Sequence, residues 1–341
     1  MPLQSEVASA ELHSAFARSA QTVSAAPTKG MNLLAIEIGG TKLQICTGNE
    51  HGELVARRRF TVDGEAGGAG IRAQIAAALP ELLAEWQPAA IGVGYGGPVD
   101  WKTGVIRCSH QVPGWENFPL AEWLRAQAGV PVFVENDANA AALGEALHGA
   151  GRGASPMVYM NSGSGVGGGL VLEGRLYHGA VPGEMEMGHL WVDQYRTNAE
   201  ELCSGWATDA CIRELIADEP ESPLARLVQS TPGGCEAKHL AQAIAEECPV
   251  ATRVCSRVAN DIAYTMSHAA HLLHPEVIVF GGGLSLIGEP LRSRIAAALA
   301  TWVMPAFAPG PRVLLAALRE DSVPVGALAL AAQRLAPGTQ A

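Results

Sequence analysis

The chain has 341 residues, of which 48% are hydrophobic and 17% charged, a balance typical of a compact globular protein with room for two domains. Its formal net charge is −11, and its 23 Lys and Arg residues form no basic stripe, which argues against nucleic acid as a partner. The sequence has no apolar run of the roughly 18 residues that a membrane span requires, so we expect no membrane partner either.

Seven cysteines are scattered along the chain without the dense spacing of a disulfide scaffold. Because their number is odd and their spacing wide, we expect reduced thiols and a cytoplasmic location. Residues 1–30 lack the basic segment and continuous apolar core of a signal peptide. We expect this segment to be a mobile leader.

Two expected β-hairpins share one pattern, an apolar strand followed by glycines and then by a second strand. The first strand of each covers residues 33–38 and 157–160. The first hairpin turns at Gly39, Gly40, Thr41 and Lys42. The second turns at a longer glycine run that includes Gly163, Ser164 and Gly165. The two halves of the chain therefore look like copies of one structural theme.

A third glycine run follows the apolar strand at residues 276–280 and leads into an expected helix over 284–291. This run consists of Gly281, Gly282 and Gly283. Ala-rich stretches predict further helices at about 70–86, 138–149 and 238–273. Strands that alternate with helices in this way are typical of an α/β protein.

The glycine turns are candidate phosphate sites, because only glycine combines the unusual backbone angles with the close approach that phosphate oxygens need. A single tight hairpin also uses glycine for purely steric reasons. The spacing Gly163, Gly165, Gly168 satisfies the dinucleotide-binding pattern, but that pattern requires a helix next, whereas residues 170–172 read as a strand. The sequence contains no Walker phosphate-binding motif.

Asn136 and Asp137 stand where a strand-like run, residues 131–134, gives way to a helical composition that begins at Ala138. The carboxyl ends of strands in an open α/β sheet face the ligand crevice, so Asp137 is a candidate general base for a substrate hydroxyl. The same residues are also good caps for the following helix. Capping and catalysis are compatible if the two neighbours divide the roles.

A second polar cluster, Glu184, Glu186 and His189, follows the second hairpin. An isolated histidine more often makes a structural hydrogen bond than a ligand contact. Carboxylates with an imidazole, however, suit the recognition of sugar hydroxyls, since each hydroxyl both donates and accepts hydrogen bonds.

Taken in order, these motifs resemble the ROK family of sugar kinases and repressors within the actin-like ATPase superfamily. The resemblance covers about residues 31–335. It rests on residues 37–42, 96–100, 135–139, 163–169, 186–189 and 281–283. It implies an α/β, two-domain, actin-like (RNase H-like) ATPase fold with the active site in the interdomain cleft. The implied domains are residues 31–137 with 325–336, and residues 138–324.

The resemblance implies an ATP-dependent hexose kinase similar to glucokinase, with Asp137 as the catalytic base. Residues implied to bind the sugar are Gly97, Asn136, Asp137, Glu186, His189 and Glu200. Those implied to hold Mg-ATP are Glu37, Gly39, Gly40, Thr41, Lys42, Gly163, Ser164, Gly165, Gly281, Gly282 and Gly283. The resemblance also implies a homodimer.

Three positions depart from the family pattern. The family's leading Asp is Glu37 here, one methylene longer, and Mg²⁺ tolerates little deviation from octahedral geometry. Many relatives carry a cysteine-rich zinc clip after the Gly-His pair, but this chain has only Cys203 there, so we expect no structural zinc. Gln111 replaces an Asn common in relatives, which bears on the choice of hexose.

A second reading is a sugar-binding or regulatory ROK protein without catalysis. Repressors of the family add a DNA-binding module ahead of the sugar pocket, and we expect the 30 residues before the region of resemblance to be too few for one. A non-catalytic binder altered at Glu37 stays open as the alternative to the kinase.

Overall fold

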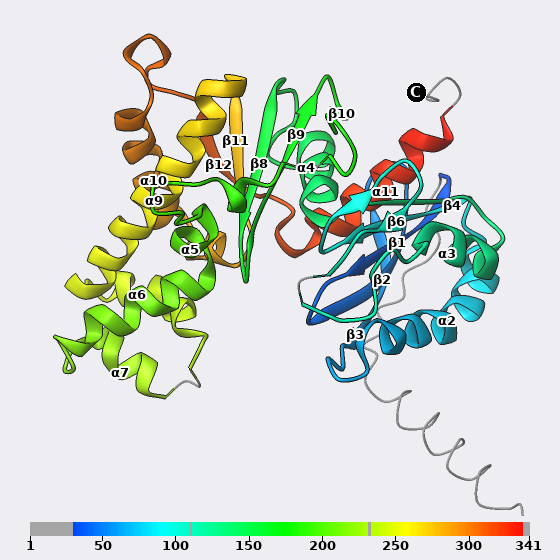
Figure 1. Cartoon of the computed structure of the whole chain (residues 1–341), viewed down its shortest axis with the longest axis horizontal. Coiled ribbons are helices and arrows are strands. Elements are labelled where there is room, and N and C mark those ends of the chain that lie inside the picture. Colours follow the sequence, from blue (N-terminus) through cyan, green and yellow to red (C-terminus); the bar gives the residue numbers. More distant parts are fainter. Residues whose placement is uncertain (1–29, 110, 184, 231–232, 337–341) are drawn as a thin grey trace, which may run out of the picture. The chain divides into compact units, whose positions relative to one another are not determined.

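The computed structural model describes residues 30–336 apart from 110, 184 and 231–232 (Figure 1). The expected leader therefore lies outside the described residues except for Gly30, and so does Glu184. The described residues divide into two compact units. The first unit contains those up to Asp137 and those from Val323 onward, and the second unit is Ala138–Ser322.

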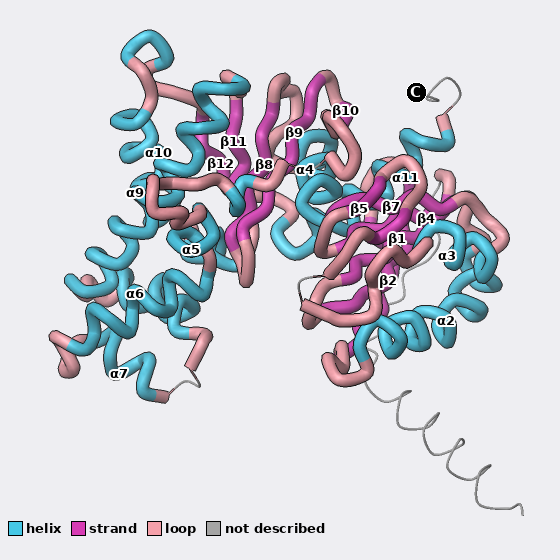
Figure 2. Tube along the Cα trace, viewed as in Figure 1, coloured by secondary structure: helices cyan, strands magenta, loops and turns pink. Residues whose placement is uncertain are grey.

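The first unit is built on a five-stranded mixed sheet of order β3-β2-β1-β4-β7 (Figure 2). β1, β4 and β7 run parallel to one another, and β2 and β3 continue the sheet antiparallel. The strand bounds are β1 (Asn32–Ile38), β2 (Lys42–Asn49), β3 (Leu54–Thr61), β4 (Ala90–Tyr95) and β7 (Val132–Asn136). The expected first hairpin is confirmed as β1 and β2.

Alternating side chains of β1 send its apolar residues to both faces of the sheet. Leu34, Ile36 and Ile38 pack in the core beneath α2 (Gly67–Trp86) and α3 (Leu120–Ala128). Leu33 and Ala35 pack in a separate cluster with α11 (Ser322–Leu335). Gly92 of β4 lies directly against the Ala327 carbonyl, so any side chain there would push α11 off the sheet. The strand reads as continuously apolar because both of its faces are covered.

The second unit has a sheet of order β10-β9-β8-β11-β12, in which β8 pairs antiparallel with β9 and parallel with β11. The strand bounds are β8 (Met157–Ser162), β9 (Val166–Leu172), β10 (Arg175–Leu176), β11 (Val277–Gly281) and β12 (Arg312–Leu315). The second hairpin is confirmed, but its turn is shorter than the glycine run. Gly167, Gly168 and Gly169 lie within β9. A Cβ at Gly169 would approach the Ala142 side chain of α4 (Asp137–His148) to 2.6 Å, so glycine there admits the helix.

The single helix expected over 238–273 is wrong. The segment forms α8 (Leu240–Ala245) and α9 (Pro249–Leu273), because Glu247 has φ 57° and Pro249 has no N–H with which to continue the first helix. The helix expected over 284–291 is likewise divided, into the 3-10 helix η3 (Gly283–Ile287) and α10 (Glu289–Trp302).

The remaining elements are short. They are β5 (Val99–Asp100), β6 (Val105–Ile106), η1 (Met187–His189), α5 (Ala199–Cys203), α6 (Gly205–Ala217), α7 (Pro223–Gln229), η2 (Glu236–His239), η4 (Pro305–Phe307) and η5 (Arg319–Asp321). Of the helices in the described residues, none has the length and apolar character needed to cross a membrane.

The chain passes between the units twice, after Asp137 in α4 and after Ser322 at the start of α11. The second passage therefore follows the first residue of α11.

Glu145 ties these two passages together within the second unit. Its carboxylate is fully buried at 0% exposure. It accepts hydrogen bonds from the N–H groups of Ala150 (2.8 Å), Ala317 (3.1 Å) and Leu318 (2.8 Å) and from the Ser322 hydroxyl (2.9 Å). One carboxylate thus joins the end of α4 to the segment that leads into α11.

We predict that Glu145→Gln lowers the thermal midpoint of the second unit. The amide presents an N–H to neighbours that are themselves donors, and leaving buried donors unsatisfied costs about 2–4 kcal/mol in unfolding free energy. Differential scanning calorimetry of the variant measures the shift. Glu221→Gln, at an exposed side chain of the same unit, is the control and leaves the midpoint unchanged. Equal midpoints for both variants would contradict the role of Glu145.

Candidate active site

Three motifs of the first unit meet at one edge of its sheet because their strands are parallel and in register. Ile38 of β1 lies opposite Tyr95 of β4, and Tyr95 lies opposite Asn136 of β7. The residues that follow these three strand ends are the first glycine turn, the Gly96-Gly97 loop and Asp137. The carboxyl edge of the sheet therefore gathers segments that are about 100 residues apart in the sequence.

The Asp137 carboxylate lies beside Gly96. The Gly96 N–H donates to the Ile38 carbonyl at 2.8 Å, and a Cβ built on Gly96 would lie 3.3 Å from Asp137 Oδ2. Glycine at this position therefore leaves the carboxylate uncovered. Asn136 Nδ2 donates to the Gly97 carbonyl at 3.3 Å, so the loop is held by the residue next to the candidate base. The Asn side chain serves the loop, and the partly buried Asp137 stands at the first position of α4.

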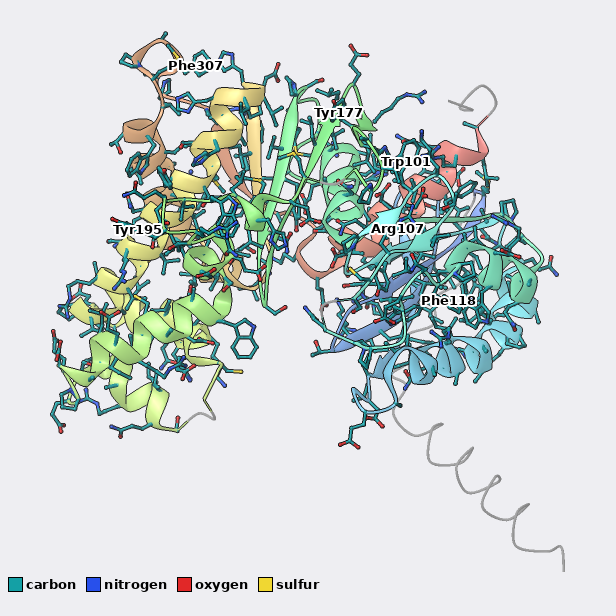
Figure 3. The ribbon with its side chains drawn as sticks, in the orientation of Figure 1. Trp101, Arg107, Phe118, Tyr177, Tyr195 and Phe307 are labelled. Carbon is teal, nitrogen blue, oxygen red and sulfur yellow. The ribbon has the colours of Figure 1, made fainter. Side chains whose placement is uncertain are left out.

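Two polar contacts support this loop. The Tyr95 hydroxyl donates to the Cys108 carbonyl at 3.4 Å, and burial raises the pKa of Tyr95, so the phenol stays neutral. Asp100 forms an ion pair with Arg107 at 2.9 Å across the β5–β6 hairpin, whose Arg107 and Trp101 are labelled in Figure 3. Asp100, the last residue of the 96–100 motif, is thus a structural residue of the hairpin.

The first glycine turn is short, with the Gly39 N–H donating to the Lys42 carbonyl at 2.8 Å. Glu37, just before it, accepts a hydrogen bond from Gln44 on the opposite strand and pairs with Lys42 Nζ at 3.2 Å. Gln44 was not among the expected site residues. Its position directly opposite Glu37 in the hairpin register would have indicated the contact.

The side chain of Gln111 fills the space that a side chain at position 40 would need. The departure at Gln111 therefore touches the first glycine turn, in addition to any effect on the choice of hexose. Thr41, at the tip of this turn, is exposed.

The second and third glycine runs converge in the second unit. The Gly163 N–H donates to the Gly165 carbonyl at 2.9 Å and closes the β8–β9 turn. Gly281 pairs with Asn161 in the parallel ladder, and Gly282, at φ 79°, lies against the Ser162 backbone. Ser164 and Gly283 are exposed beside these contacts. A Cβ at Gly283 would meet no atom within 4 Å, so the backbone is open at that residue.

Glu200 holds the second turn. Its carboxylate accepts the Val166 N–H at 2.9 Å, and a Cβ on Gly165 would lie 2.8 Å from the same oxygen. The family resemblance implies a sugar contact for Glu200, whereas the contact present in the structure is the one with the hairpin.

Glu186 and His189 are both exposed at η1, where the His189 N–H donates to the Glu186 carbonyl at 3.1 Å. Gly188 between them packs on Val166, which puts η1 next to the same hairpin. The structure thus brings Glu186, His189 and Glu200 to one end of β9.

Hydrogen bonds within the protein hold the segment after His189 together. The Ala199 N–H donates to the Leu190 carbonyl at 2.9 Å, and Asp193 accepts from the Tyr195 and Thr197 N–H groups at 2.7 and 3.1 Å. Tyr195 lies exposed in this loop (Figure 3). Within the described part of the chain, no group of three or more His, Cys, Asp or Glu residues is arranged to hold a metal ion.

The sequence matches the ROK family model over residues 33–334, nearly the whole chain. The chain belongs to the ROK family. It is 30% identical over 313 residues to a glucokinase of Thermotoga maritima, covering 89% of this chain and 98% of that protein. It is 32% identical over 307 residues to a glucokinase of Halalkalibacterium halodurans, covering 86% and 92%.

A ROK glucokinase from Streptomyces griseus, solved with glucose and AMPPNP, is similar with a TM-score of 0.79 and 29% identity. The similarity covers 89% of this chain and 99% of that one. The actin-like α/β fold and ATP-dependent hexose phosphorylation follow from membership of this family together with these relatives.

Cys203, the one cysteine in the region of the family's zinc clip, is predicted to be unreactive. Its side chain is fully buried, its Sγ lies 3.4 Å from Thr265 Oγ1, and burial raises the pKa of the thiol to about 12. At pH 8 only about one molecule in 10,000 would carry the thiolate. Iodoacetamide labelling of the native protein, read by peptide mass spectrometry, should modify the exposed Cys235 and spare Cys203. Comparable labelling of both would contradict this.

Proposed function

We propose that the protein transfers the γ-phosphoryl group of ATP to a hexose hydroxyl and that Asp137 is the general base. The observation that carries the assignment is the position of the partly buried Asp137 carboxylate at the carboxyl edge of the sheet, beside Gly96 and next to the loop that Asn136 holds. A base must stand within hydrogen-bond reach of the hydroxyl it deprotonates, and the position of Asp137 at the strand edge suits that contact.

In the proposed reaction the sugar hydroxyl oxygen attacks the γ-phosphorus as Asp137 accepts the hydroxyl proton. The bond between the γ-phosphorus and the bridging oxygen breaks, and ADP leaves with that oxygen. Phosphoryl transfer of this kind depends mainly on positioning and on charge stabilisation.

The sugar is proposed to bind through Gly97, Asn136, Asp137, Glu186, His189 and Glu200. The exposed Glu186 and His189 offer both accepting and donating groups, which matches the hydroxyls of a hexose. Glucose is the default substrate, and other hexoses or hexosamines remain alternatives because pocket geometry decides among them.

The phosphates are proposed to lie on the glycine turns, through backbone N–H groups of Gly39, Gly40 and Thr41 with Lys42, and of Gly163, Ser164 and Gly165. The glycines 281–283 would approach the nucleoside. Gly283 fits this use, since its backbone is exposed and a Cβ there would meet no atom within 4 Å. Mg²⁺ bound with the nucleotide would neutralise charge on the phosphates, and Glu37 would be the residue that orders its water.

A homodimer is also proposed, from the family resemblance. A cytoplasmic location is proposed because the described cysteines form no disulfide. Sedimentation of the purified protein tests the dimer.

We predict that Asp137→Asn lowers kcat by about 10²–10⁴-fold while sugar binding persists, because the amide keeps the hydrogen-bonding shape but accepts no proton. A coupled assay of ADP release measures kcat, and the sugar-dependent rise in thermal midpoint measures binding. The control is Asp218→Asn, at an exposed residue after α6, with unchanged kcat. Full turnover in Asp137→Asn would refute the assignment of Asp137 as the general base. Sugar binding without turnover in the unmodified protein would favour the non-catalytic alternative.

A second variant tests Glu37. Glu37→Gln removes the negative charge next to Lys42, so we expect the half-saturating Mg²⁺ concentration for activity to rise roughly tenfold. Glu81→Gln, which removes one side of the exposed Arg58–Glu81 pair at 2.7 Å, is the matched control and leaves the Mg²⁺ dependence unchanged. Identical Mg²⁺ titrations for both variants would show that Glu37 has only a structural role in the hairpin.

A further inference from the structure

Trp206 is attached to the backbone where the glycine-rich turns of the second unit meet. It is the second residue of α6. The N–H of Gly205, just before it, donates to the Gly163 carbonyl at 2.7 Å, and a Cβ on Gly163 would lie 3.9 Å from the Gly283 nitrogen. The Trp206 side chain therefore leaves the backbone next to both the β8–β9 turn and the glycine run at residues 281–283.

The indole is restrained along one edge. Gly234 has φ 89°, and a Cβ there would lie 2.9 Å from the indole Cζ3. The Gly234 N–H donates to Glu236 Oε2 at 2.9 Å, and Glu236, only 2% exposed, pairs with Arg213 of α6 at 2.8 Å. The Gly234 N–H next to the indole is thus held by Glu236, a buried carboxylate that pairs with the half-exposed Arg213.

A second buried carboxylate joins the same two segments. Asp209, on the turn of α6 that follows Trp206, accepts the Ala237 N–H at 2.7 Å and is 3% exposed. Burial raises the pKa of Asp209. These contacts join α6 to the segment at residues 234–237, one edge of the indole lies beside Gly234, and 59% of Trp206 stays exposed.

An exposed aromatic face in this position matches a nucleotide. The neighbouring turns are the ones proposed to bind phosphates, and a purine joined to those phosphates presents a flat apolar surface. Leu286, in η3 and three residues beyond Gly283, is a further exposed apolar side chain next to the same glycine run. Bases stack on aromatic side chains through their π faces, a contact that a phosphate chain alone cannot make.

We propose that Trp206 stacks on the purine base of the phosphoryl donor and makes the enzyme favour a nucleoside triphosphate over a base-free donor such as tripolyphosphate. The inference rests on the proposed function, because it takes the glycine turns of the second unit as the phosphate site. It adds the residue that reads the base.

The kinetic test compares Trp206→Ala, Trp206→Phe and the control Trp302→Ala in the full-length protein. Loss of the stacking contact should raise KM for ATP about tenfold in Trp206→Ala, with the KM for the hexose and kcat within about twofold of the unmodified enzyme. Trp206→Phe should recover most of the loss. The ratio of kcat/KM for ATP to that for tripolyphosphate should fall in Trp206→Ala, because only the base contact is removed.

A binding test needs no turnover. ADP should quench the tryptophan fluorescence of the unmodified protein and tripolyphosphate should not, and the quench should vanish in Trp206→Phe but persist in Trp302→Phe. ADP binding that weakens in Trp206→Ala in a protein with no kinase activity would support Trp206 while refuting the proposed function. Normal turnover and an unchanged KM for ATP in Trp206→Ala would refute the role of Trp206 and leave the proposed function standing. A lower thermal midpoint or altered self-association with unchanged ADP affinity would likewise overturn the proposal, leaving Trp206 a packing or interface residue.

Discussion

The register of three parallel strands is the constraint on which the candidate site depends. Because Ile38, Tyr95 and Asn136 are aligned across β1, β4 and β7, the segments after them emerge at one edge of the sheet. The hydrogen bond from Gly96 to Ile38 and that from Asn136 to Gly97 then fix their spacing at that edge. A one-residue slip in either pairing would reverse the faces of β1 or β7 and separate Asp137 from the loop beside it. The apolar residues on both faces of β1 make such a slip costly.

The second unit uses the same principle with different partners. Parallel pairing of β8 with β11 aligns Asn161 with Gly281, so the β8–β9 turn and the third glycine run leave the sheet together. Glu200 and Gly205 then tie α5 and α6 to that turn through the Val166 N–H and the Gly163 carbonyl. This ATP-dependent hexose kinase of the ROK family therefore carries its glycine turns at strand ends that backbone hydrogen bonds align. A few carboxylates, such as Glu200, join those turns to the surrounding helices.

Local patterns in the sequence predicted the parts that local physics decides. The glycine turn after Ile38 and the strand-to-helix transition at Asn136 and Asp137 were readable because apolar runs, glycines and helix formers lie next to one another. The division of 238–273 was missed because the helical composition hid the effect of Pro249. The contacts of Glu145 with Leu318 and Ser322, and of Trp206 with Gly234, join residues whose proximity is set by the packing of whole elements. No short-range pattern encodes those contacts, and only the folded chain reveals them.

The central claim is that this protein phosphorylates a hexose, and product formation tests it most directly. The purified protein would be incubated with Mg-ATP and each of a panel of hexoses and hexosamines, and the appearance of a sugar phosphate followed by ³¹P NMR. The account predicts one favoured sugar, converted to its phosphate ester at a turnover of about 1–100 s⁻¹. A sugar that raises the thermal midpoint of the protein yet yields no phosphate ester would contradict the account and identify a sugar-binding protein without kinase activity.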